Sequence, residues 1–600
     1  MKFTKILKGI VAMAISAIVT SCVMTPADDN TRTFKANKRY LVFPCAQGRT
    51  GQNKVSVDVD GKPYLAVANT LITPSDPDNW RFIDLKLMQG KRLTVKIEGP
   101  GASAINLVKV TDTIPGKYPL YREPGRPQVH FSPPRGSLND PCGLIYFEGV
   151  WHLYYAAKRF SSSDMGNPNS MWAHATSTDL LHWEEQPLFL AAVEGQYSFW
   201  TGGAAVDVDN TTGMGKPGRP AIVYSANNGG WGQSYTQCIF VSTDGGMTAQ
   251  WNPEMMYKPL PKEDERRGGG TRDPMILWWA PEKKWVMVVY NQPKGIDNYT
   301  TGKHMGFYFF ESRDLRNWTE TSVLEDQLEC PNLFSLPVDG NKENMKWVVF
   351  GSQNPYLIGN FDGKAFVPDD KNNKKIRAHF GQFSSSQVFA NAPDGRIVQV
   401  GWAHCCWYDT EFSQMAAFPL ELSLRTTPEG VRMYQDFIPE LAKLRKPGST
   451  QNNVIVKAGT SLKVGDVSQP AEIIVEFEPG SASQVSFTGA ELDIRWDAQS
   501  QELKVREFTP WEYDGKVWTT GYWPDKTVLR ASPKNGRITL HILLDVASTE
   551  VVTNGGENYV VQGRDFRKLG ENSPMEIRAD GGNIKFNRLE VYPLNSIHNY

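Results

Sequence analysis

Residues 130–155 read HFSPPRGSLNDPCGLIYFEGVWHLYY, and the architecture of the whole chain can be worked out from them. The second half holds two apolar runs, 143–147 and 150–155, separated by Glu148-Gly149. Two short apolar runs joined by two residues of this kind are typical of a β-hairpin. Asn139-Asp140-Pro141 stands shortly before the first run. We therefore expect a hairpin with a carboxylate where the chain enters it.

The same arrangement recurs along the chain. Short triplets precede further apolar runs at Thr201-Gly202-Gly203, Arg272-Asp273-Pro274, Glu329-Cys330-Pro331 and Ser384-Ser385-Ser386. With the first hairpin included, units start near residues 140, 202, 273, 329 and 384. Five units that each begin with an antiparallel pair of strands predict a five-bladed β-propeller over residues 125–435. A large β-sandwich with coincidental turns is the alternative.

A second repeated motif supports the units. Three Ser/Asp turns are each followed by a tryptophan: Ser177-Thr178-Asp179 by Trp183, Ser242-Thr243-Asp244 by Trp251, and Ser312-Arg313-Asp314 by Trp318. An Asp turn that leads into an aromatic anchor is a favourable corner between two strands. The motif therefore predicts the same strand connection in each unit.

The segments on either side of the units also alternate between apolar and polar residues. Residues 35–118 contain KVSVDVDGKPYLAV and predict a small N-terminal β-sandwich. Residues 445–600 contain EIIVEFEPG, ELDIRW and ITLHILLDV and predict a larger C-terminal β-sandwich. The sequence thus predicts an all-β protein with a propeller between two sandwiches.

The composition excludes several function classes. The 600 residues carry 64 Lys and Arg against 65 Asp and Glu, a formal net charge of −1. This balance argues against a chain-wide basic surface, so no nucleic-acid partner is expected. The six cysteines after Cys22 form no CxxC pair and no zinc spacing with histidine. Buried free thiols, with no metal site, are the expectation.

The first residues predict a processing signal. Lys2, Lys5 and Lys8 precede a ten-residue apolar run at 10–19, which is too short to span a bilayer and typical of a secretory signal. Thr20-Ser21-Cys22 resembles a bacterial lipobox, in which Cys22 would be lipidated and become the mature N-terminus. Residues 1–22 are then a lipoprotein signal peptide and 23–34 a tether. The alternative is ordinary signal cleavage with Cys22 incidental.

These features predict an exported protein, lipid-anchored in the cell envelope. The expected membrane contact is through Cys22 alone.

Three acids carry the predicted chemistry. In a propeller the innermost strands surround one axial funnel, so Asp140, Asp273 and Glu329 are expected to converge although they are far apart in sequence. Crowded carboxylates push each other's pKa values apart, which suits a glycosidase that needs one ionised nucleophile and one protonated acid. A lone Asp-Pro is more often only a turn, but the repeated phase favours a site.

Aromatic residues near the unit starts are candidate sugar-binding residues, because aromatic rings pack on the apolar faces of sugars. They are Trp172, Phe199, Trp200 and Trp402. Core packing is the expectation for most other tryptophans.

Several ordered motifs resemble glycoside hydrolase family 32, the β-fructosidases (invertases, inulinases and levanases). They are HFSPPRGSLNDPCGLIYFEGVWHLYY, MWAHATSTDLLHW, TRDP, LECPNLF and MAAFPLELSLRTT. The resemblance spans about residues 127–600, with LLDVASTEVVTNGGE in the C-terminal part. Residues 35–118 resemble an extra N-terminal domain of some bacterial members.

The resemblance implies a five-bladed propeller with a β-sandwich, and a retaining mechanism on fructans or fructo-oligosaccharides without a cofactor. Asp140 would be the nucleophile, Glu329 the acid/base and Asp273 the transition-state stabiliser. Arg272 would orient this acidic cluster, and Asn139 would line the fructose subsite. Retention requires the carboxyl groups of Asp140 and Glu329 to lie about 5–5.5 Å apart.

The chain departs from the family pattern at positions that normally shape the fructose pocket. Ser137-Leu138 replaces Trp-Met, Cys142 replaces Asn, and Ala156 stands at the position of a Gln. Gly381-Gln382-Phe383-Ser384 replaces Asp-Phe-Tyr-Ala. The sequence leaves endo and exo action, and β-2,1 and β-2,6 linkages, open.

Two other function classes remain as alternatives. A related five-bladed hydrolase acting on arabinan would use three acids with inversion, and its catalytic carboxyls would stand about 6.5–9.5 Å apart. A non-catalytic glycan-binding surface lipoprotein would keep the aromatic residues without needing all three acids.

Overall fold

The structure is a computed structural model. It describes residues 29–46, 51–75, 77, 79–160, 170–228, 236–257, 270–292, 305–352, 355–370, 374–405, 411–506, 512–513, 516–517, 527–570 and 573–598, without the side chains of 252–257, 512–513 and 516–517. The predicted signal peptide with Cys22, the first half of the predicted tether, and Cys406 lie outside the described residues. No helix in the described ranges is long and apolar enough to cross a membrane.

The N-terminal part is a sandwich of two antiparallel sheets. One sheet orders β1 (Thr31–Lys35), β6 (Arg92–Glu98), β3 (Asn53–Val59) and β4 (Lys62–Thr70); the other orders β5 (Asn79–Asp84), β2 (Tyr40–Cys45) and β7 (Lys109–Thr111). The short 3-10 helices η1 (Lys86–Met88) and η2 (Ala102–Asn106) complete it. Alternate residues of β3 and β6 are buried, as a one-sided sheet requires.

The predicted tether is too long at its C-terminal end. Thr31 to Lys35 pair with Lys96 to Arg92, so β1 begins inside the range 23–34 and the sandwich begins before residue 35. The short TRTFK segment carries only one large apolar residue, Phe34, which is why it reads as a linker.

Five units of four main strands each, two of them with one additional short strand, follow and form the propeller, as predicted. Blade 1 has β8 (Gly136–Phe147), β9 (Val150–Lys158), β10 (Met171–Ser177) and β11 (Glu184–Leu190); blade 2 has β12 (Phe199–Asp207), β13 (Ala221–Asn228), β14 (Thr236–Ser242) and β15 (Gln250–Tyr257); blade 3 has β16 (Arg272–Trp279), β17 (Lys284–Asn291), β18 (Gly306–Ser312) and β19 (Thr319–Glu325). The first strands therefore begin within a few residues of the predicted unit starts.

The last two blades share hydrogen bonds in one large sheet. Blade 4 has β20 (Asn332–Val338), β21 (Asn341–Phe350), β22 (Pro355–Phe361), β23 (Phe366–Pro368) and the short β24 (Ile376–Arg377); blade 5 has β26 (Phe383–Val388), β27 (Val398–Ala403), β29 (Met415–Ala416), β30 (Leu420–Thr427) and β31 (Gly430–Phe437). β28 (Phe412–Ser413) pairs in parallel with β8 and closes the ring between blades 5 and 1. The 3-10 helices here are η3 (Ala280–Glu282), η4 (Pro393–Gly395) and η5 (Pro439–Leu444).

The burial pattern explains why blade strands lack alternation. Every residue of β13, β14 and β17 is buried. Blades stack face to face, so both faces of a middle strand lie against apolar neighbours.

The predicted hairpin turn and two of the three Ser/Asp corners are confirmed; at the third corner Asp244 accepts N–H groups from Met247 and Thr248, and Trp251 Nε1 has no hydrogen-bond partner among the described residues. Glu148 and Gly149 have φ values of 49° and 86°, as a two-residue hairpin turn requires. In the Ser/Asp corners, Asp179 Oδ1 accepts backbone N–H groups from Leu181 and His182 at 3.0 and 2.9 Å. The next residue, Leu180, accepts Trp183 Nε1 on its carbonyl at 3.2 Å. Asp314 and Trp318 repeat this geometry, with Nε1 of Trp318 also 3.2 Å from its acceptor.

The C-terminal β-sandwich is also confirmed. Its first sheet orders β25 (His379–Gly381), β44 (Asn558–Gly563), β43 (Ser548–Thr553), β42 (Ile538–Leu544), β35 (Ala471–Glu478), β46 (Ile584–Pro593) and β32 (Ser449–Gln451), with β33 (Val454–Val456) on β46; the second orders β34 (Ser461–Asp466), β45 (Pro574–Asp580), β36 (Gln484–Gly489), β37 (Leu492–Asp497), β38 (Glu502–Val505) and β41 (Val528–Arg530). A pair β39 (Glu512–Tyr513) and β40 (Lys516–Val517) and the helix η6 (Phe566–Lys568) complete it.

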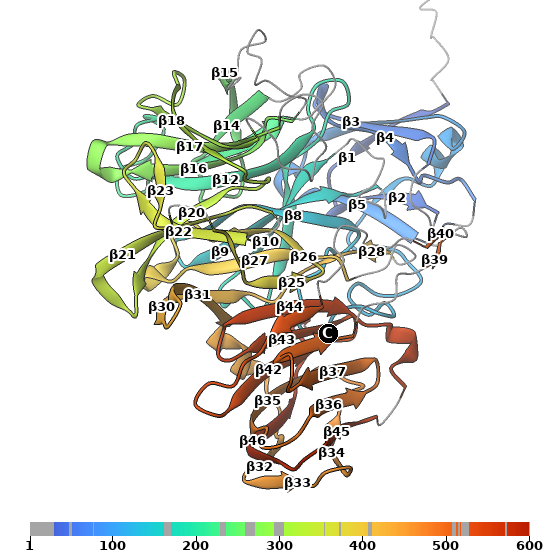
Figure 1. The fold of residues 1–600 in the computed structure, drawn as a ribbon. Helices are drawn as coiled ribbons and strands as arrows, with labels where there is room; N and C mark the ends of the chain where they lie inside the picture. The colour runs from blue at the N-terminus through green and yellow to red at the C-terminus, as the bar shows by residue number, and fades with distance from the viewer. Residues whose placement is uncertain are drawn as a thin grey trace, which may run out of the picture.

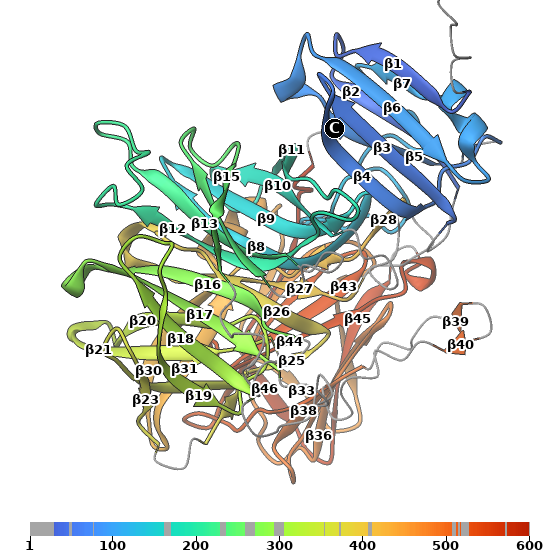
Figure 2. The same cartoon turned by 90° about the horizontal axis from the view of Figure 1, so that it is seen from above.

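The three parts are joined by side-by-side packing. Figure 1 shows the two sheets of the C-terminal sandwich below the propeller, where β25 leaves the propeller and pairs with β44. Figure 2 shows the N-terminal sandwich beside blade 1, where Lys86 Nζ donates to Gln186 Oε1 of β11 at 3.2 Å.

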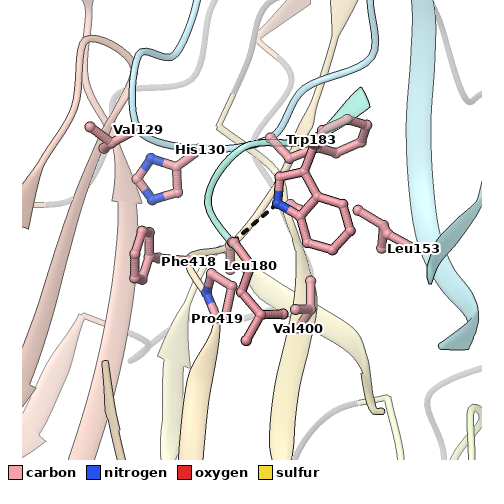
Figure 3. A pocket seen from close by; sticks show the side chains of 11 residues that line it. Val129, His130, Leu153, Leu180, Trp183, Val400, Phe418 and Pro419 are labelled. Atoms are coloured by element: carbon pink, nitrogen blue, oxygen red, sulfur yellow. Dashed lines mark hydrogen bonds between the residues drawn. The ribbon is translucent and has the colours of Figure 1, made fainter. Parts of the chain in front are cut away.

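A buried histidine holds the propeller against the C-terminal sandwich. His130 lies between Asp545, 2.7 Å from Nδ1, and Glu550, 2.9 Å from Nε2, and all three side chains are fully buried. Burial acts against the charged ring, but the two carboxylates raise the pKa of His130 from 6.5 to about 9. A small apolar pocket with Phe418 and Trp183 in its wall adjoins the ring (Figure 3). The ring is therefore a buried cation at neutral pH.

We expect the contact of His130 with Asp545 and Glu550, here called the His130 clamp, to make the stability of the protein pH-dependent. Because the pKa of folded His130 lies above its ordinary value, its stabilisation is fully present below pH 6.5 and is lost as the pH rises through about 9. The difference between these two pKa values corresponds to about 3 kcal/mol. In Tm scans from pH 6 to about pH 10, wild type should lose stability and His130→Gln should lack this loss. The exposed His182→Gln is the control, and equal slopes for His130→Gln and wild type would contradict the clamp.

Candidate active site

A one-residue bulge recurs in the innermost strand of four blades. Leu138 pairs with Ala157 and Pro141 with Tyr155, so a step of three residues along β8 matches a step of two along β9. The same shift occurs in β12, β16 and β26. Its residues are Asn139 and Asp140, Trp200 and Thr201, Asp273 and Pro274, and Ser385 and Ser386. A bulge bends its strand and redirects side chains, here at the axis of the propeller.

The expectation that the three acids occupy equivalent positions is only approximately met. Asp140 is the second bulged residue of β8, whereas Asp273 is the first bulged residue of β16. Glu329 precedes its strand, β20, altogether. The Asp-Pro pairs look aligned in sequence, but the bulges shift one of them by a residue.

Asp140 accepts hydrogen bonds from two other blades. Thr201 Oγ1 donates to its Oδ2 at 2.5 Å, and Cys330 Sγ lies 3.7 Å from the same oxygen. Burial raises the pKa of Asp140 to about 6; the bond from Thr201 opposes this rise, and the charge of Glu329 adds to it. Asp140 is therefore largely ionised at neutral pH, within reach of the other acids.

Asp273 is tied to the same point. Its Oδ2 accepts the backbone N–H of Cys330 at 3.1 Å and lies 3.7 Å from Cys330 Sγ. Burial raises the pKa of Asp273 to about 7 against the opposing charge of Arg272. The side chain is 5% exposed. Cys330 therefore bridges Asp140 and Asp273.

Arg272 holds Glu329 in place. Its Nη2 forms an ion pair with Glu329 Oε1, and its Nε lies 3.8 Å from Asp273 Oδ2. Nη1 of Arg272 donates to the Gly270 carbonyl at 2.8 Å and to Gln292 Oε1 at 3.1 Å. Although burial opposes it, the two carboxylates hold the pKa of Arg272 above its usual range. Arg272 thus lies between two of the three acids, as expected.

Several site residues have a left-handed backbone. The φ values are 59° at Asp273, 42° at Glu329, 43° at Cys330 and 49° at Ser385. Non-glycine residues adopt this region at a cost and concentrate where function requires it. The surrounding blades hold these residues in that conformation, which fixes where their side chains lie.

Comparison with known proteins shows the family to which a chain with this site belongs. Residues 130–436 match the N-terminal domain of glycosyl hydrolases family 32, and residues 440–593 match the family's C-terminal region. The chain belongs to family 32.

Two levanases and one solved structure are among its relatives. The levanase of Bacillus subtilis (strain 168) is 29% identical over 513 residues, 80% of this chain and 71% of that protein. The levanase of Bacillus sp. (strain L7) is 28% identical over 87% of this chain, which spans 60% of that protein. The exo-inulinase structure from Aspergillus awamori matches 80% of this chain and 100% of its own, with a TM-score of 0.65 and 23% identity. The last likeness concerns the fold.

Two of the four aromatic candidates do not reach the funnel of this family 32 protein. Trp172 is 0% exposed and Phe199 4%, and both pack in the apolar core between blades 1 and 2. Trp172 instead supports the site, because its Nε1 donates to the carbonyl of Trp200 at 2.7 Å. Predicting contact with sugar for Trp172 and Phe199 was wrong, since core residues at strand ends have the same sequence pattern as funnel residues.

Trp200 and Trp402 are better placed. Trp200 is half-buried in the bulge beside Thr201. Trp402 is half-buried, pairs with Ser384 across blade 5 and stacks on His404 with ring centres 3.7 Å apart. Asn139 Oδ1 is buried and has no hydrogen-bond partner within the described residues, which suits a group that awaits a ligand.

Four of the residues that depart from the family pattern, those of blade 1, pack inward, whereas Ser384 of blade 5 is half-buried and bonds to His404. Leu138 and Cys142 are 0% exposed, Ser137 1% and Ala156 7%. Cys142 Sγ donates to the Asp140 carbonyl at 3.3 Å. The departures therefore change the support behind Asp140.

Sequence reasoning missed three hydroxyl residues. Thr201 and Ser385 each contribute a hydrogen bond that lowers the pKa of Asp140, and Ser352 Oγ donates to Glu329 Oε2 at 3.2 Å. Thr201 and Ser385 stand in triplets that precede the first apolar run of their units, as the three acids do. This shared position could have marked them as site residues. Ser352 follows the second strand of blade 4 and carries no such signal. Across the described part of the chain, no cluster of three or more His, Cys, Asp or Glu could hold a metal ion.

The hydroxyl of Thr201 makes a testable contribution to the acidity of Asp140. Thr201→Val removes the hydrogen bond that lowers the pKa of Asp140, so this pKa should rise above about 6. If Asp140 acts ionised, the acid limb of kcat/KM should move to higher pH. The pH–rate profile measures this, with Thr211→Val, which lies away from the acids in blade 2, as control. An unmoved limb would show that Thr201 does not tune Asp140.

Proposed function

We propose that this protein is a retaining β-fructosidase that cleaves fructans or fructo-oligosaccharides by double displacement. The observation that carries the proposal is the convergence of Asp140, Asp273 and Glu329, from three blades, around Cys330 and Arg272. The membership in family 32 and the two related levanases support the substrate class.

The proposed roles follow from the environments of the acids. Asp140 accepts hydrogen bonds that favour its ionised form, so it attacks the anomeric carbon of the fructosyl unit. Glu329 is 19% exposed against 5% for Asp273, so it is the acid that the leaving oxygen and the incoming water reach. It protonates that oxygen in the first step and activates water in the second.

Asp273 and Arg272 complete the mechanism. Asp273 accepts fructose hydroxyls and stabilises the positive charge that develops on the sugar. Arg272 keeps the Glu329 carboxyl group oriented, as the acid in the first step and as the carboxylate in the second. Asn139 offers its unpaired Oδ1 to a fructose hydroxyl.

Product analysis on levan, inulin, sucrose and arabinan tests the proposal. The protein without residues 1–22 should release fructose or fructo-oligosaccharides from at least one fructoside and should leave arabinan intact. Fructose alone would indicate exo action, and a ladder of oligosaccharides endo action. Hydrolysis of arabinan alone, or of none of the four, would contradict the proposal.

We also propose export with lipidation at Cys22, supported by the lipobox-like sequence. The full chain expressed in a bacterial host should incorporate labelled fatty acid and fractionate with membranes, and Cys22→Ser should do neither. Cys45→Ser is the matched control, and equal labelling of wild type and Cys22→Ser would refute the anchor.

A further inference from the structure

The N-terminal sandwich makes a buried polar contact where the propeller ring closes. Nη1 of Arg81, on β5, donates to the carbonyl oxygen of Glu411 at 2.5 Å. The backbone N–H of Gly136 donates to the same oxygen at 3.1 Å. Arg81 is 0% exposed. One carbonyl therefore joins the N-terminal sandwich to the first residue of β8, the strand that carries Asp140.

This junction leaves β8 little freedom. Gly136 has a φ of 83°, and a Cβ there would lie 2.5 Å from the Lys158 carbonyl oxygen. Phe412 and Ser413 of β28 pair with Gly136 and Ser137, which is the pairing that closes the ring. Figure 2 shows β28 between the N-terminal sandwich and the propeller. Arg81 thus fixes the segment that sets the start of β8.

A second set of contacts joins the N-terminal sandwich to the segment that precedes β12, the strand of Thr201. On β4, Ala66 donates to the Ala192 carbonyl at 2.9 Å and accepts the N–H of Glu194 at 2.8 Å. Lys54 Nζ lies 2.6 Å from Glu194 Oε2. The segment that follows enters β12, on which Thr201 donates to Asp140.

The two contacts therefore lie at the segments that lead into the strands of Asp140 and Thr201, which share one hydrogen bond. The Arg81 contact sets the strand of Asp140, and the contacts of Ala66 and Lys54 set the strand of Thr201. We propose that the N-terminal sandwich is a positioning element of the catalytic unit, with Arg81 as its main positioning residue. The inference rests on the proposed function of Asp140 as the nucleophile.

The chemistry of Arg81 supports a positioning role. Burial lowers the pKa of Arg81 to about 10, so the side chain still carries its charge at neutral pH. A buried cation is costly to desolvate, and an apolar residue would serve simple packing better. A guanidinium, however, fixes direction as well as distance through its rigid fork of donors.

Kinetics of four variants against wild type test this role. Arg81→Met removes the first contact, Arg81→Lys keeps one donor, and Lys54→Gln removes the partly exposed ion pair of the second contact. Lys38→Gln is the control, because it breaks an exposed ion pair with Asp112 within the same sandwich. Each is assayed for kcat, KM and the pH dependence of kcat/KM on the best fructoside, with the fraction folded measured in parallel.

We expect a loss in kcat with an altered pH profile. Arg81→Met should lower kcat about tenfold, because small displacements of a reacting group are costly. Its acid limb should move to higher pH, since a weaker bond from Thr201 raises the pKa of Asp140. Arg81→Lys should recover part of both effects, Lys54→Gln should show a smaller shift in the same direction, and Lys38→Gln should match wild type.

Two results would overturn the inference. One is a wild-type acid limb and kcat per folded molecule in both Arg81→Met and Lys54→Gln. The other is a loss that follows only the folded fraction. If Arg81→Met does not fold, Arg81→Lys and Lys54→Gln decide by the same criteria.

Hydrogen exchange separates this inference from the proposed function. A wild type that cleaves no fructoside would refute the function and leave the positioning contact to be judged without turnover. Exchange should then rise in residues 136–141 of Arg81→Met and stay unchanged in residues 284–291 of blade 3. Unchanged exchange in residues 136–141 would overturn the positioning role.

Discussion

Asp140→Asn should abolish fructoside hydrolysis while the protein stays folded. An amide has no charge with which to attack the anomeric carbon, and we expect kcat to fall on the order of 10⁴-fold or more. The change is nearly isosteric, and burial already disfavours the charge of Asp140, whose pKa it raises to about 6. Tm should therefore not fall. Initial rates on the fructoside that wild type cleaves best, with Tm in parallel, measure both effects.

An acid from the same propeller gives the matched control. Asp207 is 0% exposed at the end of β12 and accepts backbone and hydroxyl donors from Thr211 and Thr212. Asp207→Asn should lower Tm and keep kcat per folded molecule. Substantial turnover by Asp140→Asn, at rates near wild type, would remove Asp140 from the role of nucleophile.

Glu329→Gln should impair both chemical steps. The variant has no proton to give to the leaving oxygen and no base for water, so we expect kcat to fall about 10³-fold on sucrose or fructan. A fructosyl fluoride needs no proton on its leaving group, so its first step should be much less affected. A burst of fluoride followed by slow turnover is the expected time course.

Azide distinguishes a missing base from general damage. Added azide should attack the fructosyl intermediate directly and restore turnover of Glu329→Gln as a fructosyl azide, because an anion needs no general base. Glu343→Gln serves as the control, because Glu343 is an exposed residue on β21. Equal losses on fructosyl fluoride and sucrose, without rescue, would contradict the acid/base role of Glu329.

The fold could be predicted because its signals are local and repeated. The hairpin at Glu148-Gly149 and the Asp179 and Asp314 corners are short patterns with direct backbone consequences. The triplets that precede apolar runs recur five times, and this repetition predicts the five blades. The short strand β1 lacks such a pattern, so the sequence predicts a tether over most of it.

The site could be predicted only in part. The three acids stand in motifs, but which face a side chain occupies depends on a bulge that shifts the register by one residue. Trp172 and Trp200 lie in similar sequence surroundings, and only packing decides that the first is core and the second lines the bulge.

Contacts between domains left no sequence signal at all. His130 meets Asp545, and Arg81 meets Glu411, across more than 300 residues. Each of these residues looks like an ordinary polar residue in its own segment. The role of the N-terminal sandwich therefore becomes visible only from the structure.

The capture of methanol tests the central claim, a covalent fructosyl intermediate on the face of Asp140, most directly. Wild-type protein is incubated with its fructoside in aqueous methanol, and the methyl fructoside formed is identified by NMR. We predict methyl β-fructofuranoside, because two displacements retain the configuration. Methyl α-fructofuranoside, or complete hydrolysis with no methyl fructoside at any methanol concentration, would contradict the account.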